Sequence, residues 1–257
     1  MWRNVRIAFL LLILGVAAWS NWYDRLSTTD WDETLYVGVF PVEEPGNPVV
    51  HDYIERLSSD HIADIEKFLN EEAREFGIGI ARPVTVDLYP PVAERPPERG
   101  ASSNVLQNMW WSLKLRMYAR RAARESGKPP PQIRLFVLYH DPAFSQAVPH
   151  SVGLQKGLVG VVHAFAAARM TRGNNVVIAH EILHTLGASD KYDPDTLAPL
   201  FPIGYAEPDR TPRFPQPFAE IMAGRSAVDA RTFEIPESLD KVVVGEATAL
   251  EIRWIGK

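Results

Sequence analysis

The spacing of apolar and polar residues predicts a succession of strands and helices between residues 34 and 187. Alternation and β-branched content predict strands, and apolar positions three and four apart predict amphipathic helices. The predicted strands are Thr34–Phe40, Val84–Leu88, Ile133–Tyr139 and Leu158–Ala166. The predicted helices are Ser59–Phe76, Asn104–Arg124 and a third that starts at the segment Asn174–Ala179, whose asparagines look like a helix cap. This order predicts an α+β domain.

The last seventy residues have a less regular pattern. Prolines recur from Pro194 to Pro217, which predicts a stiff loop without periodic structure. Partly periodic apolar residues from Gly245 to Trp254 predict a closing helix. We therefore expect one domain over 23–257, with an upper lobe at about 30–187 and a lower lobe at about 188–257.

The first 22 residues are set apart by their hydropathy. Arg3 and Arg6 precede an apolar run from Ile7 to Ala18, which indicates a targeting segment. The run is short enough for a cleaved signal peptide, but Trp19 and Trp22 are typical of an interfacial belt and favour an uncleaved membrane anchor. Either alternative places the rest of the chain in the periplasm or outside the cell, membrane-anchored in one case and secreted in the other.

Composition narrows the choice of function. The chain is 46% hydrophobic and 23% charged, as globular proteins are, and its formal charge of −5 argues against a general nucleic-acid binder. It has no cysteine, which excludes disulfides and thiolate chemistry. The predicted helix Asn104–Arg124 is locally basic; a solvated face is the ordinary interpretation, and a membrane-facing role is the alternative.

The segment from His180 to Asp190 carries the strongest chemical signal, with the pattern H-E-x-x-H-x-x-G-x-x-D. On a helix, His180 and His184 share one face and can bind one metal ion together. Glu181, one position on, can reach a metal-bound water and act as a general base. Two histidines and one carboxylate on Zn²⁺ leave the open position of a catalytic site.

The third ligand follows the helix. Gly187 can adopt a positive φ, end the helix and let Asp190 turn towards the metal. Asp193 is a competitor only three residues on. The family resemblance described next implies Asp190, because this residue has the spacing of that family's extended motif.

This segment resembles the zinc signature of the metzincin metallopeptidases, and an aspartate as third ligand makes it similar to the snapalysin type. Met222, within Ala219–Gly224, resembles the methionine turn that lies beneath the metal in that family. The resemblance implies a metzincin-like fold: a twisted mixed β-sheet with a backing helix and an active-site helix, then a small irregular C-terminal lobe with the methionine turn and a closing helix.

The resemblance also suggests substrate-binding residues. Metzincins use the strand before the zinc helix as an edge that pairs with substrate, which would engage main-chain groups of Gly160, Val161, Val162 and His163. Tyr192 and Tyr205 lie between the third ligand and Met222, and either phenol could donate to an oxyanion, although packed tyrosines are common.

Together these features predict a zinc metallopeptidase that acts on a peptide or protein substrate with one Zn²⁺ per chain. Two alternatives remain open at this point. The chain could be a membrane-tethered, zinc-containing protein that binds peptides or envelope proteins without turnover. The zinc could also be structural, with a fourth ligand supplied by one of three carboxylates, namely Asp193, Glu207 and Glu220.

Overall fold

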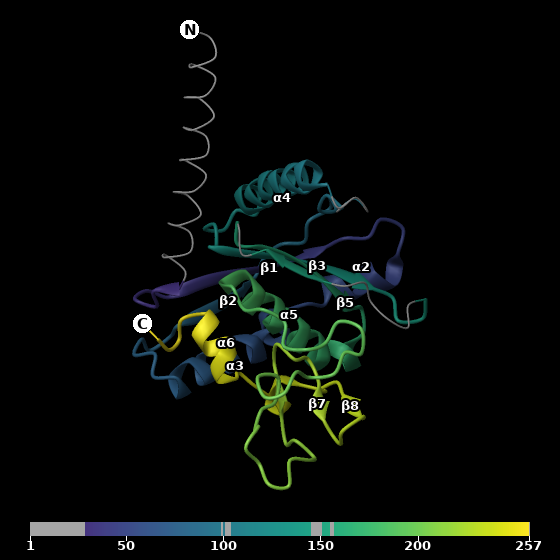
Figure 1. Cartoon of the computed structure of the whole chain (residues 1–257). Helices are drawn as coiled ribbons and strands as arrows, with labels where there is room; N and C mark the ends of the chain where they lie inside the picture. Colours follow the sequence, from purple (N-terminus) through teal and green to yellow (C-terminus); the bar gives the residue numbers. More distant parts are fainter. Residues whose placement is uncertain (1–28, 99, 101–103, 145–150, 155–156, 257) are drawn as a thin grey trace.

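A computed structural model describes residues 29–98, 100, 104–144, 151–154 and 157–256 (Figure 1). Its centre is a five-stranded sheet in the order β2-β1-β3-β5-β4. Strands β2, β1, β3 and β5 are parallel, and β4 runs antiparallel to β5. The strands are β1 (Leu35–Val42), β2 (Val84–Leu88), β3 (Ile133–His140), β4 (Val152–Leu154) and β5 (Val159–Phe165). The fold is therefore mixed α+β with a mostly parallel central sheet.

Helices cover both faces of this sheet (Figure 1). The helices α3 (Ala63–Glu75) and α5 (Thr171–Leu186) lie on one face, and α4 (Val105–Glu125) lies on the other. Alternate residues of β3 explain the two layers: Leu135 and Val137 belong to the core with α5, whereas Phe136 belongs to the core with α4. A strand buried on both faces needs a run of apolar residues, as β3 has from Leu135 to Tyr139.

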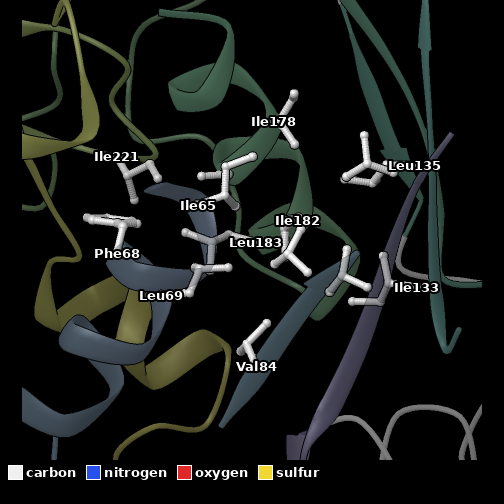
Figure 2. Packing of buried hydrophobic residues seen from close by; sticks show 14 of the residues in the cluster. Ile65, Phe68, Leu69, Val84, Ile133, Leu135, Ile178, Ile182, Leu183 and Ile221 are labelled. Atoms are coloured by element: carbon white, nitrogen blue, oxygen red, sulfur yellow. The ribbon is translucent and has the colours of Figure 1, made fainter. Parts of the chain in front are cut away.

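The larger core joins the sheet, α3 and α5. Figure 2 shows Ile178, Ile182 and Leu183 of α5 pointing towards side chains of α3 and the strands. Ile182 and Leu183 have no exposed surface, and burial of such side chains contributes about 1.5–3 kcal/mol each. This packing fixes the helix that carries the motif.

Strands β1, β2, β3 and β5 and helices α3, α4 and α5 were all predicted from the sequence. Some of them begin or end at other residues than predicted. Predicted helix 59–76 is divided into a 3-10 turn η1 (Ser59–His61) and α3. The predicted start of the third helix, at Asn174, was wrong, because α5 begins at Thr171 after a turn η2 (Ala168–Met170). Asn174 lies inside α5, where its amide exchanges two hydrogen bonds with the backbone of Phe165 at the end of β5.

Helix α2 (Pro48–Glu55) and strand β4, both before residue 187, were not expected from the sequence. Helix α2 is capped by Asn47, whose side chain accepts a hydrogen bond from the amide of Val50. Strand β4 has only three residues, and it covers β5 with the pairs Val152↔Val161, Gly153↔Gly160 and Leu154↔Val159. Strand β5 is therefore an interior strand, and the prediction that it forms the sheet edge was wrong.

Residues 188–256 form the irregular part of the fold. They contain the short strands β6 (Ala219–Glu220), β7 (Ser226–Ala227), β8 (Phe233–Glu234) and β9 (Val242–Val243), the turn η3 (Leu239–Lys241) and helix α6 (Glu246–Glu251). Helix α6 is the predicted closing helix, although it is shorter than Gly245–Trp254. Ile221, Met222 and Trp254 join the larger core, so both predicted lobes share one hydrophobic interior.

The predicted anchor or signal peptide at 1–22 lies outside the described residues. Within the part of the chain that the structure describes, no helix has the length and hydropathy needed to cross a membrane.

Candidate metal centre

Helix α5 places His180 and His184 one turn apart with their rings 4.6 Å apart. The helix ends at Gly187, which has φ 108°, as the sequence predicted. The amide of Ala188 donates to the carbonyl of Leu183 at 3.0 Å, so the chain turns back at this point. A residue with a Cβ atom would be strained at Gly187.

The turn brings Asp190 to both histidines. Its Oδ1 atom lies 3.3 Å from Nε2 of His180 and 3.1 Å from Nε2 of His184. Ligand atoms about 2.0–2.2 Å from a tetrahedral zinc ion are about 3.3 Å from one another. The Oδ1 atom of Asp190 is therefore close to the separation from each Nε2 atom that a shared zinc ion requires.

Backbone carbonyls orient both imidazole rings. Nδ1 of His180 donates to the carbonyl of Ile221 at 2.9 Å, and Nδ1 of His184 donates to the carbonyl of Ala188 at 2.8 Å. Because a carbonyl can only accept, the ring hydrogen is on Nδ1 and the lone pair is on Nε2. Two lone pairs and a carboxylate oxygen thus converge on one point, and a cation there is the natural partner of this donor set.

The carboxylate of Glu181 is buried beside this point, with 4% of the residue exposed. One ligand atom from each of His180, Glu181 and His184 lies within 4.8 Å of the others. The Oε2 atom of Glu181 has no hydrogen-bond partner among the described residues. Burial raises the pKa of Glu181 and outweighs the attraction of the two histidines, as suits a group that must take up a proton. Asp190, in contact with both Nε2 atoms, is the better third ligand.

The histidines and Asp190 change one another's ionisation. Burial alone would raise the pKa of Asp190, but when no metal is bound and the histidines carry a second proton on Nε2, the hydrogen bonds from His180 and His184 hold that pKa well below its usual range. Burial likewise lowers the pKa of His184, and its hydrogen bond to Asp190 overcomes this and raises it. Asp190 is therefore ionised at neutral pH, as a metal ligand must be.

A buried ion pair holds the third-ligand loop. Lys191 is 2% exposed, and its Nζ atom donates to Glu251 of α6 at 2.7 Å and to the carbonyl of Ser189 at 2.8 Å. Glu251 also accepts from the amide and hydroxyl of Ser189. Asp190 is thus flanked on both sides by residues fixed to α6. Neither Lys191 nor Glu251 was predicted from the sequence, because a lysine directly after the proposed third ligand carries no distinct signal.

Met222 lies in the larger core, with no exposed surface, directly after Ile221. Its carbonyl accepts from the amide of Lys191 at 2.9 Å, and the preceding carbonyl accepts from His180. The turn is held by Glu220, whose carboxylate accepts from the amides of Ala223 and Gly245 and from the hydroxyl of Thr248. This turn therefore supports both a ligand and the loop that carries Asp190.

The alternative ligands are all engaged elsewhere. Asp193 accepts from the amides of Asp195 and Thr196 in its own turn. Glu207 pairs with Arg210, and Glu220 is occupied in the methionine turn. Each of the three carboxylates therefore already has its own partners, which favours a site with an open position over a closed one.

The two candidate tyrosines have different positions. Tyr192 lies at the metal centre, where burial and contact with Asp190 raise its pKa. Tyr205 packs edge-on against Phe201 and lines a separate cleft with residues of α6. Tyr192 is therefore available to a substrate at the metal centre, whereas Tyr205 belongs to the packing of the proline-rich loop.

A cavity of about 260 Å³ opens beside His180 and Glu181. Its walls are mostly apolar, with Val177, Leu197 and Ile235 among them, and Arg225 adds one positive charge. Gly224 also lines it. The cavity can accept an apolar side chain next to the metal centre.

The residues expected on the substrate edge lie elsewhere. Gly160 and Val161 are already paired with β4, and Val162 is buried in the core next to α5. The backbone amide of His163 donates to the hydroxyl of Ser151. Its Nδ1 atom lies 2.8 Å from Nε2 of His140. The edge beside the metal centre is instead β4, where Gly153 approaches both His184 and Glu181.

Comparisons with known proteins leave this site to be judged on its geometry. Neither the protein-family models nor the curated proteins include a match to this chain. One solved structure, described as a chaperone-substrate complex, is similar over 87% of this chain with 11% sequence identity and a TM-score of 0.39. This chain spans 35% of the length of that one. A similarity at this level carries no functional argument.

Proposed function

We propose that this chain is a zinc-dependent metalloendopeptidase. The observation that carries the proposal is the position of Asp190 Oδ1, within 3.3 Å of both histidine Nε2 atoms of a helical H-E-x-x-H motif. His180, His184 and Asp190 would hold one Zn²⁺, and Glu181 would be the catalytic base. When bound, zinc would supply a Lewis acid that lowers the pKa of a water molecule and polarises the scissile carbonyl.

The protein residues would divide the remaining work. Glu181 would take a proton from the attacking water on Oε2 and later deliver it to the leaving amine. Its raised pKa brings it closer to the range in which one carboxyl can do both at neutral pH. The phenol of Tyr192 could donate to the oxyanion, because it lies at the metal centre next to Asp190.

Several features support a metzincin-type site within this general class. The sheet is mixed, and helix α5 carries the motif. Met222 is buried directly after Ile221, whose carbonyl accepts from His180, and α6 is the last helix of the described residues. These agree with the parts that the resemblance implies, and the aspartate keeps the snapalysin-like character of the third ligand.

The substrate would be an extended peptide. Strand β4 is the edge of the sheet, and Gly153 brings it against His184 and Glu181, so a peptide added to β4 would pass the metal centre. The adjacent cavity favours an apolar side chain beside the scissile bond. We also propose that segment 1–22 attaches the chain to a membrane, with the catalytic domain outside the cytoplasm.

Metal removal and restoration test this proposal against the zinc-containing binding protein without turnover. The full chain would be stripped with a chelator, restored with one equivalent of Zn²⁺ and incubated with a quenched peptide library. A peptidase cleaves only in the restored state, and mapped products should share an apolar residue at one position beside the cut. A restored, zinc-loaded protein that leaves the library intact would contradict the proposal and favour the binding protein.

A further inference from the structure

Helix α4 has two apolar faces, of which the sheet covers only one. The covered face includes Leu115, Tyr118 and Ala119, which pack against Phe40 and Phe136 of the sheet. Burial on that face is enough to hold the helix in place. Figure 1 shows α4 on the outside of the molecule, with no element above it among those described.

The opposite face carries a stripe of large apolar side chains. At 100° per residue, these five positions fall within about one third of the helix circumference. Their exposed fractions run from 47% to 72%, and they are Leu106, Met109, Trp110, Leu113 and Met117. Scattered exposed apolar residues are ordinary, but a contiguous stripe over three turns marks an interaction surface.

Positive charge accompanies this stripe. Helix α4 has five basic residues and one acidic residue, although the chain as a whole has a formal charge of −5. Arg120 and Arg124 are exposed and continue the apolar stripe into the last turns. Lys114 lies beside it, with its Nζ atom 5.7 Å from the centre of the Trp110 ring. Apolar and basic side chains therefore share one outward side.

We propose that this outward side of α4 docks on an anionic lipid membrane surface. Leucine, methionine and tryptophan side chains at this position would enter the headgroup boundary, while lysine and arginine would pair with lipid phosphates. Charge favours this occupant over a second copy of the chain. Two copies with parallel α4 helices would bring the same arginines together, and two with antiparallel helices would place the arginines against the apolar first turns. An apolar protein partner would leave the basic turns unexplained.

Docking in this way has a consequence for the metal centre. The sheet separates α4 from α5, so the metal centre lies on the far side of the sheet from the helix that contacts lipid (Figure 1). A chain attached through residues 1–22 and resting on α4 would hold its substrate cavity away from the bilayer. It would therefore act on peptides that extend from the membrane or lie beyond it.

The cysteine-free sequence allows a site-specific test. Leu113→Cys and, as a matched control, Leu250→Cys on α6 would be labelled with an environment-sensitive fluorophore; both positions are exposed, at 47% and 57%. The labelled full chain would be reconstituted in vesicles of phosphatidylcholine with or without phosphatidylglycerol. Quenchers in the lipid chains and iodide in the water would report which side each label contacts.

On anionic vesicles, we expect lipid quenching of the label at 113 to be at least twice that at 250, and iodide quenching to be correspondingly weaker. Without phosphatidylglycerol, or with Arg120→Gln and Arg124→Gln combined, the label at 113 should return to the control value, since each basic residue contributes about fivefold to partition. Equal iodide quenching at both positions would overturn the proposal. So would shielding at 113 from both quenchers together with energy transfer between labelled copies, which would identify a second chain as the occupant.

Discussion

Lys191 and Glu251, 60 residues apart in sequence, form an ion pair of 2.7 Å that ties the third-ligand loop to helix α6. Ser189 hydrogen-bonds to both residues, so Asp190 stands between two fixed neighbours. The position of Asp190, the proposed third ligand, therefore depends on helix α6.

Replacing Glu251 by glutamine should loosen this arrangement. The buried ammonium of Lys191 would lose its counter-charge, which we expect to lower the free energy of unfolding by about 2 kcal/mol. Zinc affinity should fall about 10- to 100-fold, as for other groups that orient metal ligands. Glu246→Gln, at an exposed position of the same helix, is the control. Unchanged zinc affinity in Glu251→Gln, measured by competition with a chelating dye, would remove this role.

A side chain at Gly153 should disrupt the metal centre. A Cβ atom there would lie 2.6 Å from Cβ of His184 and 2.9 Å from the carbonyl oxygen of Glu181. Gly153→Ala should displace β4 or α5 and reduce peptide cleavage at least tenfold. Gly79→Ala, where a Cβ atom meets nothing within 4 Å, should keep full activity. Equal activity in the two variants would show that β4 is not held against the catalytic helix.

Asp190 and Asp193 can be separated by substitution. Asp190→Ala should weaken zinc binding by at least 100-fold, because it removes one of three ligands. Asp193→Ala should leave zinc binding within about twofold, since this carboxylate only caps its own turn. Isothermal titration with Zn²⁺ measures both constants, and the reverse order would exchange the two assignments.

The His140–His163 pair should make stability sensitive to acid. Burial, with added repulsion from His140 and Arg95, lowers the pKa of His163 to about 4. Below pH 6.5 the unfolded chain takes up a proton that the folded chain refuses until about pH 4, so stability is lost as pH falls through this window. The urea midpoint of His163→Gln should therefore fall less between pH 7 and pH 4.5 than that of the parent. Equal decreases in the urea midpoints of the two proteins would show that protonation of His163 is not coupled to folding.

Local patterns in the sequence were sufficient to predict most of the architecture. Alternation and helical spacing identified β1, β2, β3, β5, α3, α4 and α5, because these elements bury regular apolar faces. Strand β4 was missed because three residues carry no period, and its place depends on the lack of a side chain at Gly153. Asn174 was mistaken for a cap because an asparagine that bridges two elements looks the same in sequence as one that ends a helix.

The candidate metal centre likewise has residues that could be predicted from local sequence and residues that could not. His180, Glu181, His184 and Gly187 act through spacing within one helix and its end, which sequence displays directly. The loop that carries Asp190 is held by Lys191 and Glu251, and the ring of His180 is oriented by a carbonyl 41 residues away. Such contacts depend on tertiary structure, so the sequence could suggest a third ligand but not what positions it.

The most direct measurement of the central claim compares the parent with Glu181→Ala at one zinc per chain. Zinc content would be determined by elemental analysis, and cleavage of the quenched peptide library would be followed in the same samples. The account predicts one zinc in both proteins and cleavage only by the parent, because Glu181 acts on the water and not on the metal. Cleavage at equal rates by both proteins would contradict the assignment of Glu181 as the base, and absence of zinc from the parent would contradict the metal centre itself.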